Sequence, residues 1–235
     1  MPGLTTLRTA LDELEAWLIS RGVDLDAPRD DTIDPYDHDQ QIRAATAYTN
    51  AHTPARYAHA TADDPAVTDW ARQVIDRATA ESANHVQRFV RTGPSLLLLG
   101  ATGVGKTHQA YGALRLIAQA GVRARWVATT AADFYASLRP RHGIDSEQEF
   151  RAVANAPILL LDDLGAAKNS EWVEEVNYRL INWRYERELP TILTSNLGPK
   201  ELAAELDERV ASRLRQLAKQ VSLKGDDRRS SQRPS

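Results

Sequence analysis

Residues 100–107 read Gly-Ala-Thr-Gly-Val-Gly-Lys-Thr and follow directly on a run of four leucines at residues 96–99. Glycine, four residues, glycine, lysine and threonine is the pattern of a turn between a buried strand and a helix, in which backbone N–H groups converge on phosphates. A helical pattern comes next, with apolar or small residues at Tyr111, Leu114, Ile117 and Ala118. This is the context that the pattern needs, and it predicts an α/β protein that binds a nucleotide.

The residue types in this loop have separate chemical tasks. Gly100, Gly103 and Gly105 carry no side chain, so the backbone can come close to the phosphates. Lys106 is expected to reach the β- and γ-phosphates, and the Thr107 hydroxyl is expected to bind Mg²⁺. The whole loop is predicted to contact the nucleotide: Gly100, Ala101, Thr102, Gly103, Val104, Gly105, Lys106 and Thr107.

The composition limits the other classes of function. The 235 residues, 42% of them hydrophobic, suffice for one large α/β core with a smaller appendage. The chain has no cysteine, which excludes disulfides, zinc ribbons and thiol catalysis. The acidic amino terminus and the lack of a long apolar run predict a cytoplasmic protein without membrane contact. A net charge of −3 gives no general basic field, so any nucleic-acid contact is expected to be local.

The first fifty residues are expected to form a separate helical region. Their leucines recur at three- and four-residue spacing, on one stripe of a helix: Leu4, Leu7, Leu11, Leu14 and Leu18. The stripe fits a helix that binds a partner protein, and equally one that packs on its own core. We predict a partner-binding region at residues 1–50, an ATPase domain at residues 51–223 and a disordered tail at residues 224–235.

Helical and strand patterns alternate in the second part of the chain. Residues 66–91 fit one amphipathic helix that leads into the core. Strands are then predicted at residues 95–99, 123–128, 158–161, 191–194 and 221–223, with helices at residues 106–120, 131–138, 146–155, 170–188, 199–205 and 207–218. Such alternation predicts a five-stranded parallel sheet with helices on both faces.

Two aspartates directly follow the predicted strand at residues 158–161. Because ligands bind at the carboxyl ends of strands in open α/β sheets, Asp162 is predicted to hold Mg²⁺ and Asp163 to orient and deprotonate the attacking water. A turn or a helix cap is the alternative for such a pair. The strand at residues 123–128 lies between the lysine and the aspartates in the chain. We expect it to separate their two strands in the sheet, as in P-loop ATPases that activate water.

Two further residues complete the predicted site. Asn196 follows the strand at residues 191–194. An amide there can fix the same water and sense the γ-phosphate, because it both donates and accepts hydrogen bonds, although asparagine is also a common turn residue. Arg213 lies on a predicted helix. It is either a solvated arginine or one that reaches a neighbouring subunit's ATP and stabilises charge on the transferring phosphoryl group.

Four segments, GATGVGKT, ILLLDDLG, PTILTSN and ERVASRL, resemble in this order and spacing the DnaC/DnaI-type helicase loaders and the related IstB transposition ATPases. Both groups belong to the initiator clade of the AAA+ proteins. The resemblance covers about residues 50–223, and residues 54–57 resemble the segment that leads into the core in the loader branch. It implies an ATPase in which Lys106 and Thr107 have the phosphate-loop roles and Asp162 and Asp163 the Walker B roles. Asn196 would be the sensor-1 residue and Arg213 the arginine finger.

Two departures from the family pattern bear on the activity. The usual catalytic residue is a glutamate, and Asp163 is one methylene shorter, so hydrolysis is expected to be slow and stimulated by assembly. The chain after Arg213 is too short for the helical lid that usually carries a second sensor arginine. Loader and IstB modules also look lidless, so the predicted fold is an AAA+ type P-loop NTPase without a carboxyl-terminal lid.

The clade has an extra helical segment after its second strand, which lines a path for single-stranded DNA. The matching region is residues 130–155, with aromatic residues on its first helix and basic residues just beyond. Aromatic rings stack on unpaired bases, so Tyr135 and Arg139, one helical turn apart, are the predicted DNA contacts. The alternative is that the neighbouring Phe134 packs in the core and the arginines are only solvated.

The residues predict an ATP- and Mg²⁺-dependent protein, and the resemblance implies that it loads a replicative helicase during DNA replication. With ATP bound it would assemble with its own copies, bind single-stranded DNA and hold the helicase until ATP turnover. The nearest alternative is a helper ATPase for a transposase. A P-loop kinase for a small molecule is the alternative from another class, and the paired aspartates and the Ser-Asn strand end argue against it.

Overall fold

The computed structural model describes residues 35–82, 87–140, 143, 145–166 and 170–225. The leucine stripe of residues 4–18 and most of the predicted tail lie outside these ranges. None of the described helices is both long enough and apolar enough to cross a bilayer.

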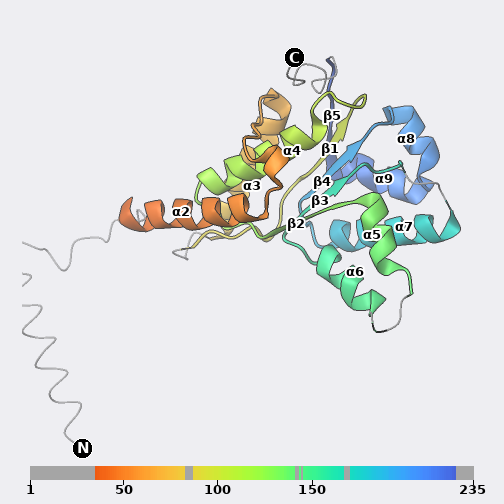
Figure 1. The fold of residues 1–235 in the computed structure, drawn as a ribbon, viewed down its shortest axis with the longest axis horizontal. Coiled ribbons are helices and arrows are strands. Elements are labelled where there is room, and N and C mark those ends of the chain that lie inside the picture. The colour runs from red at the N-terminus through yellow and green to blue at the C-terminus, as the bar shows by residue number, and fades with distance from the viewer. Residues whose placement is uncertain (1–34, 83–86, 141–142, 144, 167–169, 226–235) are drawn as a thin grey trace, which may run out of the picture. The chain divides into compact units, whose positions relative to one another are not determined.

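The centre of the structure is a five-stranded sheet in the order β2-β3-β4-β1-β5, in which every neighbouring pair is parallel (Figure 1). The strands are β1 (Ser95–Leu99), β2 (Trp126–Thr130), β3 (Ile158–Asp162), β4 (Thr191–Ser195) and β5 (Ala218–Ser222). Strands β1 and β4 are buried along their whole length, because helices cover both faces of the sheet. The predicted five-stranded parallel sheet with helices on both faces is confirmed.

The prediction about the separating strand is wrong. β4, and not β2, lies between the lysine strand β1 and the aspartate strand β3, while β2 forms the edge of the sheet. β4 pairs with β1 from Leu96↔Ile192 onward and with β3 from Leu159↔Thr191 onward. Order along the chain does not fix lateral order in a sheet, so the sequence could not distinguish the two arrangements. The correction matters because it brings the residue after β4 between the lysine and the aspartates.

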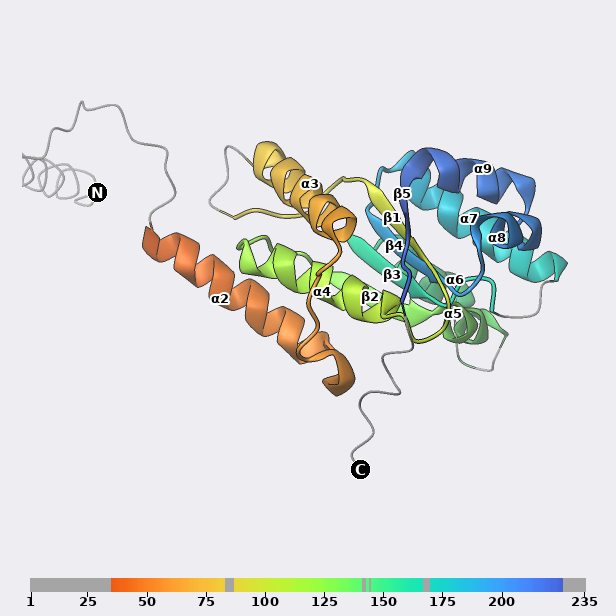
Figure 2. The same cartoon turned by 90° about the horizontal axis from the view of Figure 1, so that it is seen from above.

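Alternation along the strands produces two cores. Leu96 and Leu98 face a first core built with α3 (Pro65–Glu81) and α4 (Lys106–Gln119), and α2 (Pro35–His52) packs on α4. Leu97 and Leu99 face a second core. This second core is built with α5 (Ala131–Leu138), α6 (Ser146–Ala154), α7 (Glu171–Glu186), α8 (Pro199–Glu205) and α9 (Glu208–Leu217). Figure 2 shows the two groups of helices on opposite sides of the sheet.

Helix α3 is shorter than predicted. Asp64 caps its start by accepting a hydrogen bond from the backbone N–H of Ala66 at 2.8 Å, and the helix ends at Glu81. Before β1 the backbone is extended, and Phe89 forms a parallel bridge with Arg123. Val90 packs in the first core from this extended segment. The apolar side chain of Val90 therefore fits the helical periodicity of the sequence, although Val90 is not part of the helix.

Helix α2 spans residue 50, where the sequence analysis placed a domain boundary. The helix packs against α4, and Tyr48 near its end donates a hydrogen bond to the Trp126 carbonyl at 3.4 Å. The described part of residues 1–50 is thus attached to the sheet domain. The partner-binding role of that region remains a prediction.

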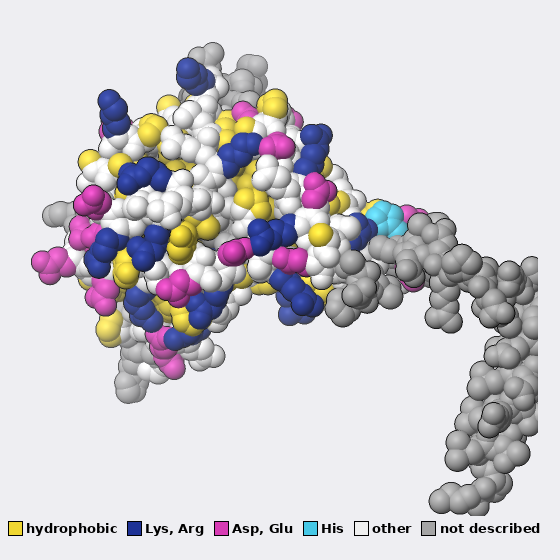
Figure 3. All heavy atoms as spheres, turned by 180° about the vertical axis from the view of Figure 1, so that it is seen from behind, with side chains coloured by type: hydrophobic (Ala, Val, Ile, Leu, Met, Phe, Trp, Pro, Cys, Tyr) yellow, Lys and Arg dark blue, Asp and Glu magenta, His cyan; other side chains and the backbone are white. Residues whose placement is uncertain are grey.

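The surface charges are mixed on the face that Figure 3 shows, where basic and acidic side chains are interspersed. No broad area of one sign stands out on this face among the described residues. This distribution agrees with the small net charge of −3.

Candidate nucleotide-binding site

A cavity of about 380 Å³ lies at the carboxyl ends of β1, β3 and β4. Residues from the phosphate loop, from the two strand ends and from a short segment after α2 form its walls. The lining residues are Arg56, Tyr57, Thr102, Gly103, Gly105, Lys106, Thr107, His108, Asp162, Asp163 and Asn196. The structure therefore brings the predicted metal and sensor residues together with part of the phosphate loop, whereas Gly100, Ala101 and Val104 are not among the lining residues.

The glycines of the loop meet two different requirements. Gly103 and Gly105 adopt φ angles of 89° and 100°, which favour glycine, and Gly105 precedes the first turn of α4. Gly100 is needed for packing as well, since a Cβ atom there would lie 2.4 Å from the Leu223 carbonyl oxygen. The Leu223 N–H donates to the Leu99 carbonyl at 2.8 Å. Leu223, the residue that follows β5, thus lies directly against the start of the phosphate loop.

Lys106 is buried at the base of the cavity. Its Nζ donates to the carbonyls of Gly100 at 2.7 Å and Ala101 at 2.9 Å, and to Asn196 Oδ1 at 2.7 Å. These acceptors hold the ammonium at the first turn of α4, where backbone N–H groups and the helix dipole also favour an anion.

Thr107 and Asp162 form the candidate Mg²⁺ site. The Thr107 hydroxyl donates to the two Asp162 carboxylate oxygens at 3.0 and 3.1 Å. The hydroxyl and the carboxylate therefore lie side by side in the wall of the cavity. Mg²⁺ prefers hard oxygen ligands and usually takes one or two from the protein beside phosphates and water, so these residues fit the ion. Burial raises the pKa of Asp162 above its ordinary value, and the nearby charge of Asp163 raises it further.

Asn196 connects the lysine to the second aspartate. Its Oδ1 accepts from Lys106, and its Nδ2 donates to Asp163 Oδ1 at 3.1 Å. Asp163 has a φ of 57°, an uncommon conformation for a residue with a side chain. Such conformations concentrate at functional sites, where the surrounding structure maintains them.

Four residues at this site were missed or were noted only as part of a resembling segment. Thr194 donates to Asp162 Oδ1 at 2.5 Å and accepts from the Asp163 backbone N–H at 3.0 Å, so it holds the Asp162 carboxylate and the backbone of Asp163. His108 accepts from the Thr61 N–H at 3.2 Å. The other two are Arg56 and Tyr57, which lie in the segment at residues 54–57. The position of Thr194 directly before Ser-Asn was the one sequence signal available.

Tyr57 belongs to an aromatic pair at the cavity. Its ring stacks on Tyr111, with centroids 4.8 Å apart and an angle of 18°. Burial raises the pKa of Tyr111 to about 12, so its hydroxyl stays protonated. The pair fixes the segment before α3 against α4, which positions one wall of the cavity.

Arg213 lies on α9, and it is not among the described residues that line the cavity of its own chain. Its guanidinium carbon lies over the Tyr178 ring, 4.9 Å from the centroid. An arginine that serves a neighbouring subunit need not line its own cavity, so this position leaves the predicted role open.

The burial of Tyr135 argues against its predicted contact with DNA bases. Its side chain lies in the second core, and its hydroxyl donates to Asn177 Oδ1 at 2.7 Å. Arg139 is exposed, but α5 ends at Leu138 and Arg139 is in an extended conformation. The helical spacing that would have placed the two side chains on one exposed face therefore does not apply.

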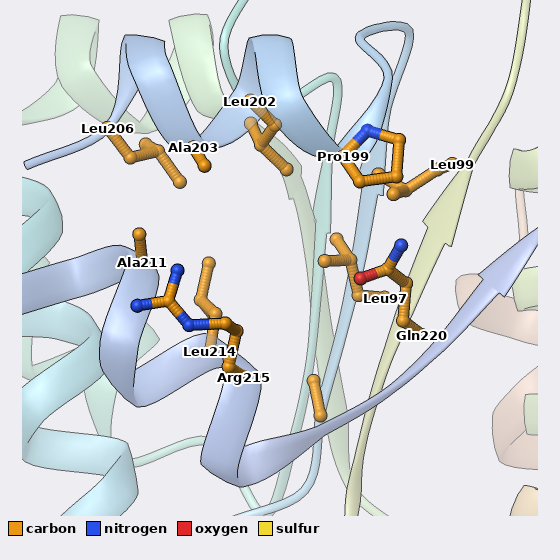
Figure 4. A pocket seen from close by; sticks show the side chains of 11 residues that line it. Leu97, Leu99, Pro199, Leu202, Ala203, Leu206, Ala211, Leu214, Arg215 and Gln220 are labelled. Carbon is orange, nitrogen blue, oxygen red and sulfur yellow. The ribbon is translucent and has the colours of Figure 1, made fainter. Parts of the chain in front are cut away.

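A second cavity, of about 200 Å³, is apolar and lies between β1, β5, α8 and α9 (Figure 4). Its walls include Leu97, Leu202, Leu206 and Leu214, and Arg215 is the one charged residue among the described residues that line it. It lacks the convergent polar groups of the first cavity, so the first cavity is the candidate nucleotide site.

Comparisons with known proteins show similar sequences and a similar fold. The family described as IstB-like ATP binding protein matches residues 44–235. The replicative helicase loader DnaI of Bacillus subtilis is 30% identical over 177 residues, which cover 66% of this chain and 56% of DnaI. An ATP-binding protein in an insertion sequence of Mycobacterium tuberculosis is 29% identical over 153 residues, 63% of this chain and 60% of that protein. This chain thus spans less than two thirds of either relative.

A solved structure agrees with the sequence comparisons. The crystal structure of the DnaC helicase loader matches with a TM-score of 0.54 and 28% identity, covering 73% of this chain and 100% of that one. The predicted resemblance to DnaC/DnaI-type loaders and IstB ATPases is therefore confirmed, together with the AAA+ type fold. Because the family match spans most of its length, the chain belongs to the family of IstB-like ATP-binding proteins.

Proposed function

We propose that this protein is an ATPase that binds ATP with Mg²⁺, hydrolyses it slowly between assembled copies, and delivers a replicative helicase to single-stranded DNA. The observation that carries the ATPase part is the hydrogen-bonded connection Lys106–Asn196–Asp163. It joins a phosphate-binding cation to a candidate catalytic base across the ends of three neighbouring strands, β1, β4 and β3. A protein that only bound a nucleotide would have no need for this connection.

Each residue of the connection has a distinct role in the proposed reaction. Lys106 binds the β- and γ-phosphates, and Thr107 and Asp162 hold Mg²⁺, which neutralises phosphate charge when bound. Asp163 orients the attacking water and accepts its proton. Asn196 holds that water and changes its hydrogen bonds when a γ-phosphate reaches Lys106.

In the proposed reaction, assembly of the copies adds a further cation to each site. Asp163 is shorter than the family's usual glutamate, so the base reaches less far toward the water and turnover in one subunit is slow. Arg213 from a neighbouring copy would stabilise the charge that develops in the transition state. The proposed ATPase is therefore stimulated by whatever brings the copies together.

The helicase and DNA parts of the proposal depend on relatives. DnaI and DnaC are replicative helicase loaders by name, and the similarity covers 66% of this chain for DnaI and 59% for DnaC. We assign helicase capture to residues 1–50 and single-strand contact to the region around Arg139. Tyr135 is left out of the contact because it is buried.

A second candidate function has its own support. The matching family carries the description IstB-like ATP binding protein, and the M. tuberculosis relative is an ATP-binding protein in an insertion sequence. In that case the same ATPase would serve a transposase instead of a helicase.

One set of assays tests the proposal. ATP turnover is measured with and without single-stranded DNA, and helicase transfer to a single-stranded circle is followed by subsequent unwinding. Loading that requires ATP and fails with Asp163→Asn supports a helicase loader. Stimulation of transposase strand transfer without helicase transfer supports the second candidate, and turnover that responds to neither partner nor DNA contradicts both.

A further inference from the structure

Two tyrosines of α7 surround Arg213. The Arg213 guanidinium carbon lies 4.9 Å from the Tyr178 ring centroid and 5.9 Å from that of Tyr185. Arg213 Nη2 also donates to the Tyr178 hydroxyl at 3.5 Å, the outer limit of a hydrogen bond. The two tyrosines are seven residues apart, so they lie on one face of the helix. Both rings are within the distance at which an aromatic face attracts a cation.

A second arginine at the same place is neutralised, whereas Arg213 is not. Arg209 lies over the same Tyr178 ring at 4.4 Å, and its Nε donates to Asp207 at 3.0 Å. Within the described residues Arg213 forms no ion pair, and its buried Nε has no hydrogen-bond partner. The face between α7 and α9 thus presents one uncompensated cation supported by aromatic rings.

We propose that Tyr178 is a positioning residue for ATP hydrolysis, which holds the Arg213 guanidinium in the orientation that a neighbouring subunit's ATP requires. This inference rests on the proposed inter-subunit role of Arg213. Tyr178 does not touch the nucleotide, and it acts through the arginine.

The physical reason is the freedom of the arginine side chain. A long side chain without a carboxylate partner samples many rotamers, and this conformational freedom is lost when the guanidinium binds a phosphate. A ring fixes the guanidinium plane without neutralising its charge, whereas a carboxylate would compete with the phosphate. Tyr185, whose hydroxyl donates to Gln216 at 3.0 Å, restricts the far side.

The plain alternative is that Tyr178 only packs, since it is partly buried against the second core. The test must therefore separate positioning from stability. Tyr178→Phe keeps the ring and removes the hydroxyl, whereas Tyr178→Leu removes the ring. In assembled protein we expect kcat to fall about 3- to 20-fold for Tyr178→Leu with KM unchanged, and less than about twofold for Tyr178→Phe.

Mixed assemblies determine on which side of the interface Tyr178 acts. Tyr178→Leu mixed with Asp163→Asn should regain turnover, because some interfaces then join an intact Asp163 to an intact Tyr178–Arg213 pair. Tyr178→Leu mixed with Arg213→Ala should not, because both variants damage the same partner of the interface. A mixture of Arg213→Ala with Asp163→Asn serves as the reference for the inter-subunit role itself.

A second series avoids any loss of the fold. Phenylalanines with one, two or three fluorine atoms at position 178 keep the ring size while withdrawing the electron density that attracts a cation. Turnover should fall stepwise with fluorination at constant ATP affinity and melting temperature. A flat series, or wild-type turnover for Tyr178→Leu while Arg213→Ala is defective, overturns the positioning role and leaves the proposed function intact. Wild-type turnover for Arg213→Ala overturns both.

Discussion

At the scale of single residues, Asn196 links the two charged groups that the proposed chemistry needs. Its amide accepts from Lys106 and donates to Asp163. A γ-phosphate is a stronger acceptor for an ammonium than an amide oxygen is, so ATP should draw Lys106 from Asn196. The freed amide can then turn toward the attacking water. In the proposed reaction, nucleotide binding and activation of the base would thereby be linked through one side chain.

Replacing Lys106 tests the phosphate site. Lys106→Ala should weaken ATP binding by one to two orders of magnitude, because a charge-assisted contact contributes about 1.5–3 kcal/mol. Asp163→Asn should keep ATP affinity and lose hydrolysis. Calorimetric titration measures the ATP affinity of both variants, and ATP turnover measures hydrolysis. Lys200→Ala, at an exposed lysine of α8, is the matched control. Equal affinities for wild type and Lys106→Ala would remove Lys106 from the site.

The raised pKa of Asp162 predicts a pH dependence of Mg²⁺ binding. A proton competes with Mg²⁺ for this carboxylate, and burial raises the pKa of Asp162 above the ordinary aspartate value of 3.8, so the competition begins at a higher pH. Affinity for Mg²⁺ with ATP should fall as the pH drops through this raised pKa. Without Mg²⁺, the contribution of Asp162 to stability is full below the ordinary pKa and is lost as the pH rises through the raised one.

Titrations of Mg²⁺ at several pH values measure this effect. Asp162→Asn should bind Mg²⁺ weakly at every pH, with no comparable slope. An identical pH profile for wild type and Asp162→Asn would show that another group titrates.

The site residues that the sequence could predict are those whose type is tied to a task. A lysine and a threonine in a glycine-rich loop, two aspartates after a buried strand and an asparagine after the next strand mark phosphate, metal and water contacts. Thr194 was missed because a threonine inside a strand is ordinary, and its role arises only from the neighbouring β3. Tyr135 was misjudged because aromatic residues serve cores and bases alike.

At the scale of elements, Arg184 ties α7 to two other parts of the fold. Its fully buried guanidinium donates to the carbonyls of Ala154 and Ala156 at 3.0 and 2.8 Å, to the Pro190 carbonyl at 2.6 Å and to Thr191 Oγ1 at 2.7 Å. Desolvation by burial lowers the pKa of Arg184 to about 9. The chain segments before β3 and β4, whose ends carry Asp162 and Asn196, are both held by this side chain.

Removing Arg184 should destabilise the sheet. Arg184→Leu leaves buried carbonyls without donors, so we expect a loss of about 3–5 kcal/mol in the free energy of unfolding. Urea denaturation followed by circular dichroism measures it. Arg187→Leu, at the exposed arginine that directly follows α7, should change stability by less than about 0.5 kcal/mol. Equal denaturation midpoints for the two variants would contradict the structural role of Arg184.

Most elements were predictable because their periodicity and their end signals agree. Helix α5, for example, begins after Thr130, whose hydroxyl accepts from the Asp133 N–H at 3.0 Å, and it ends where predicted at Leu138. The end of α3 and the position of β2 were not predictable. The first depends on Val90 packing from an extended segment, and the second on which strands pair across the sheet.

At the scale of the whole molecule, the position of α2 changes where the chain can be shortened. α2 packs on α4, and Tyr48 contacts Trp126 edge to face. A chain that begins at residue 51 would expose that surface of the first core. A chain that begins at Pro35 keeps it, while it lacks the leucine stripe of residues 4–18.

We therefore expect the chain from Pro35 to bind ATP with the affinity of the full chain and to lose capture of the helicase. The chain from residue 51 should melt at a lower temperature. Calorimetry, thermal melting and helicase pull-down measure the three properties. Undiminished capture by the chain from Pro35 would place the helicase contact on the ATPase domain.

Whether the ATPase is completed between subunits separates a loader from any self-contained kinase. Arg213 is not among the described residues that line the cavity of its own chain, so any action on a nucleotide would be on that of another copy. An arginine that stabilises charge developing in the transition state affects turnover far more than binding. Arg213→Ala should thus bind ATP nearly normally as an isolated subunit and hydrolyse it poorly, whereas Arg187→Ala should behave as wild type in both respects. Mixing Arg213→Ala with Asp163→Asn, each inactive alone, should restore part of the activity, because some interfaces then pair an intact Asp163 with an intact Arg213. If the mixture stays inactive although the two variants demonstrably co-assemble, each subunit hydrolyses ATP with its own residues, and Arg213 has no catalytic role between copies.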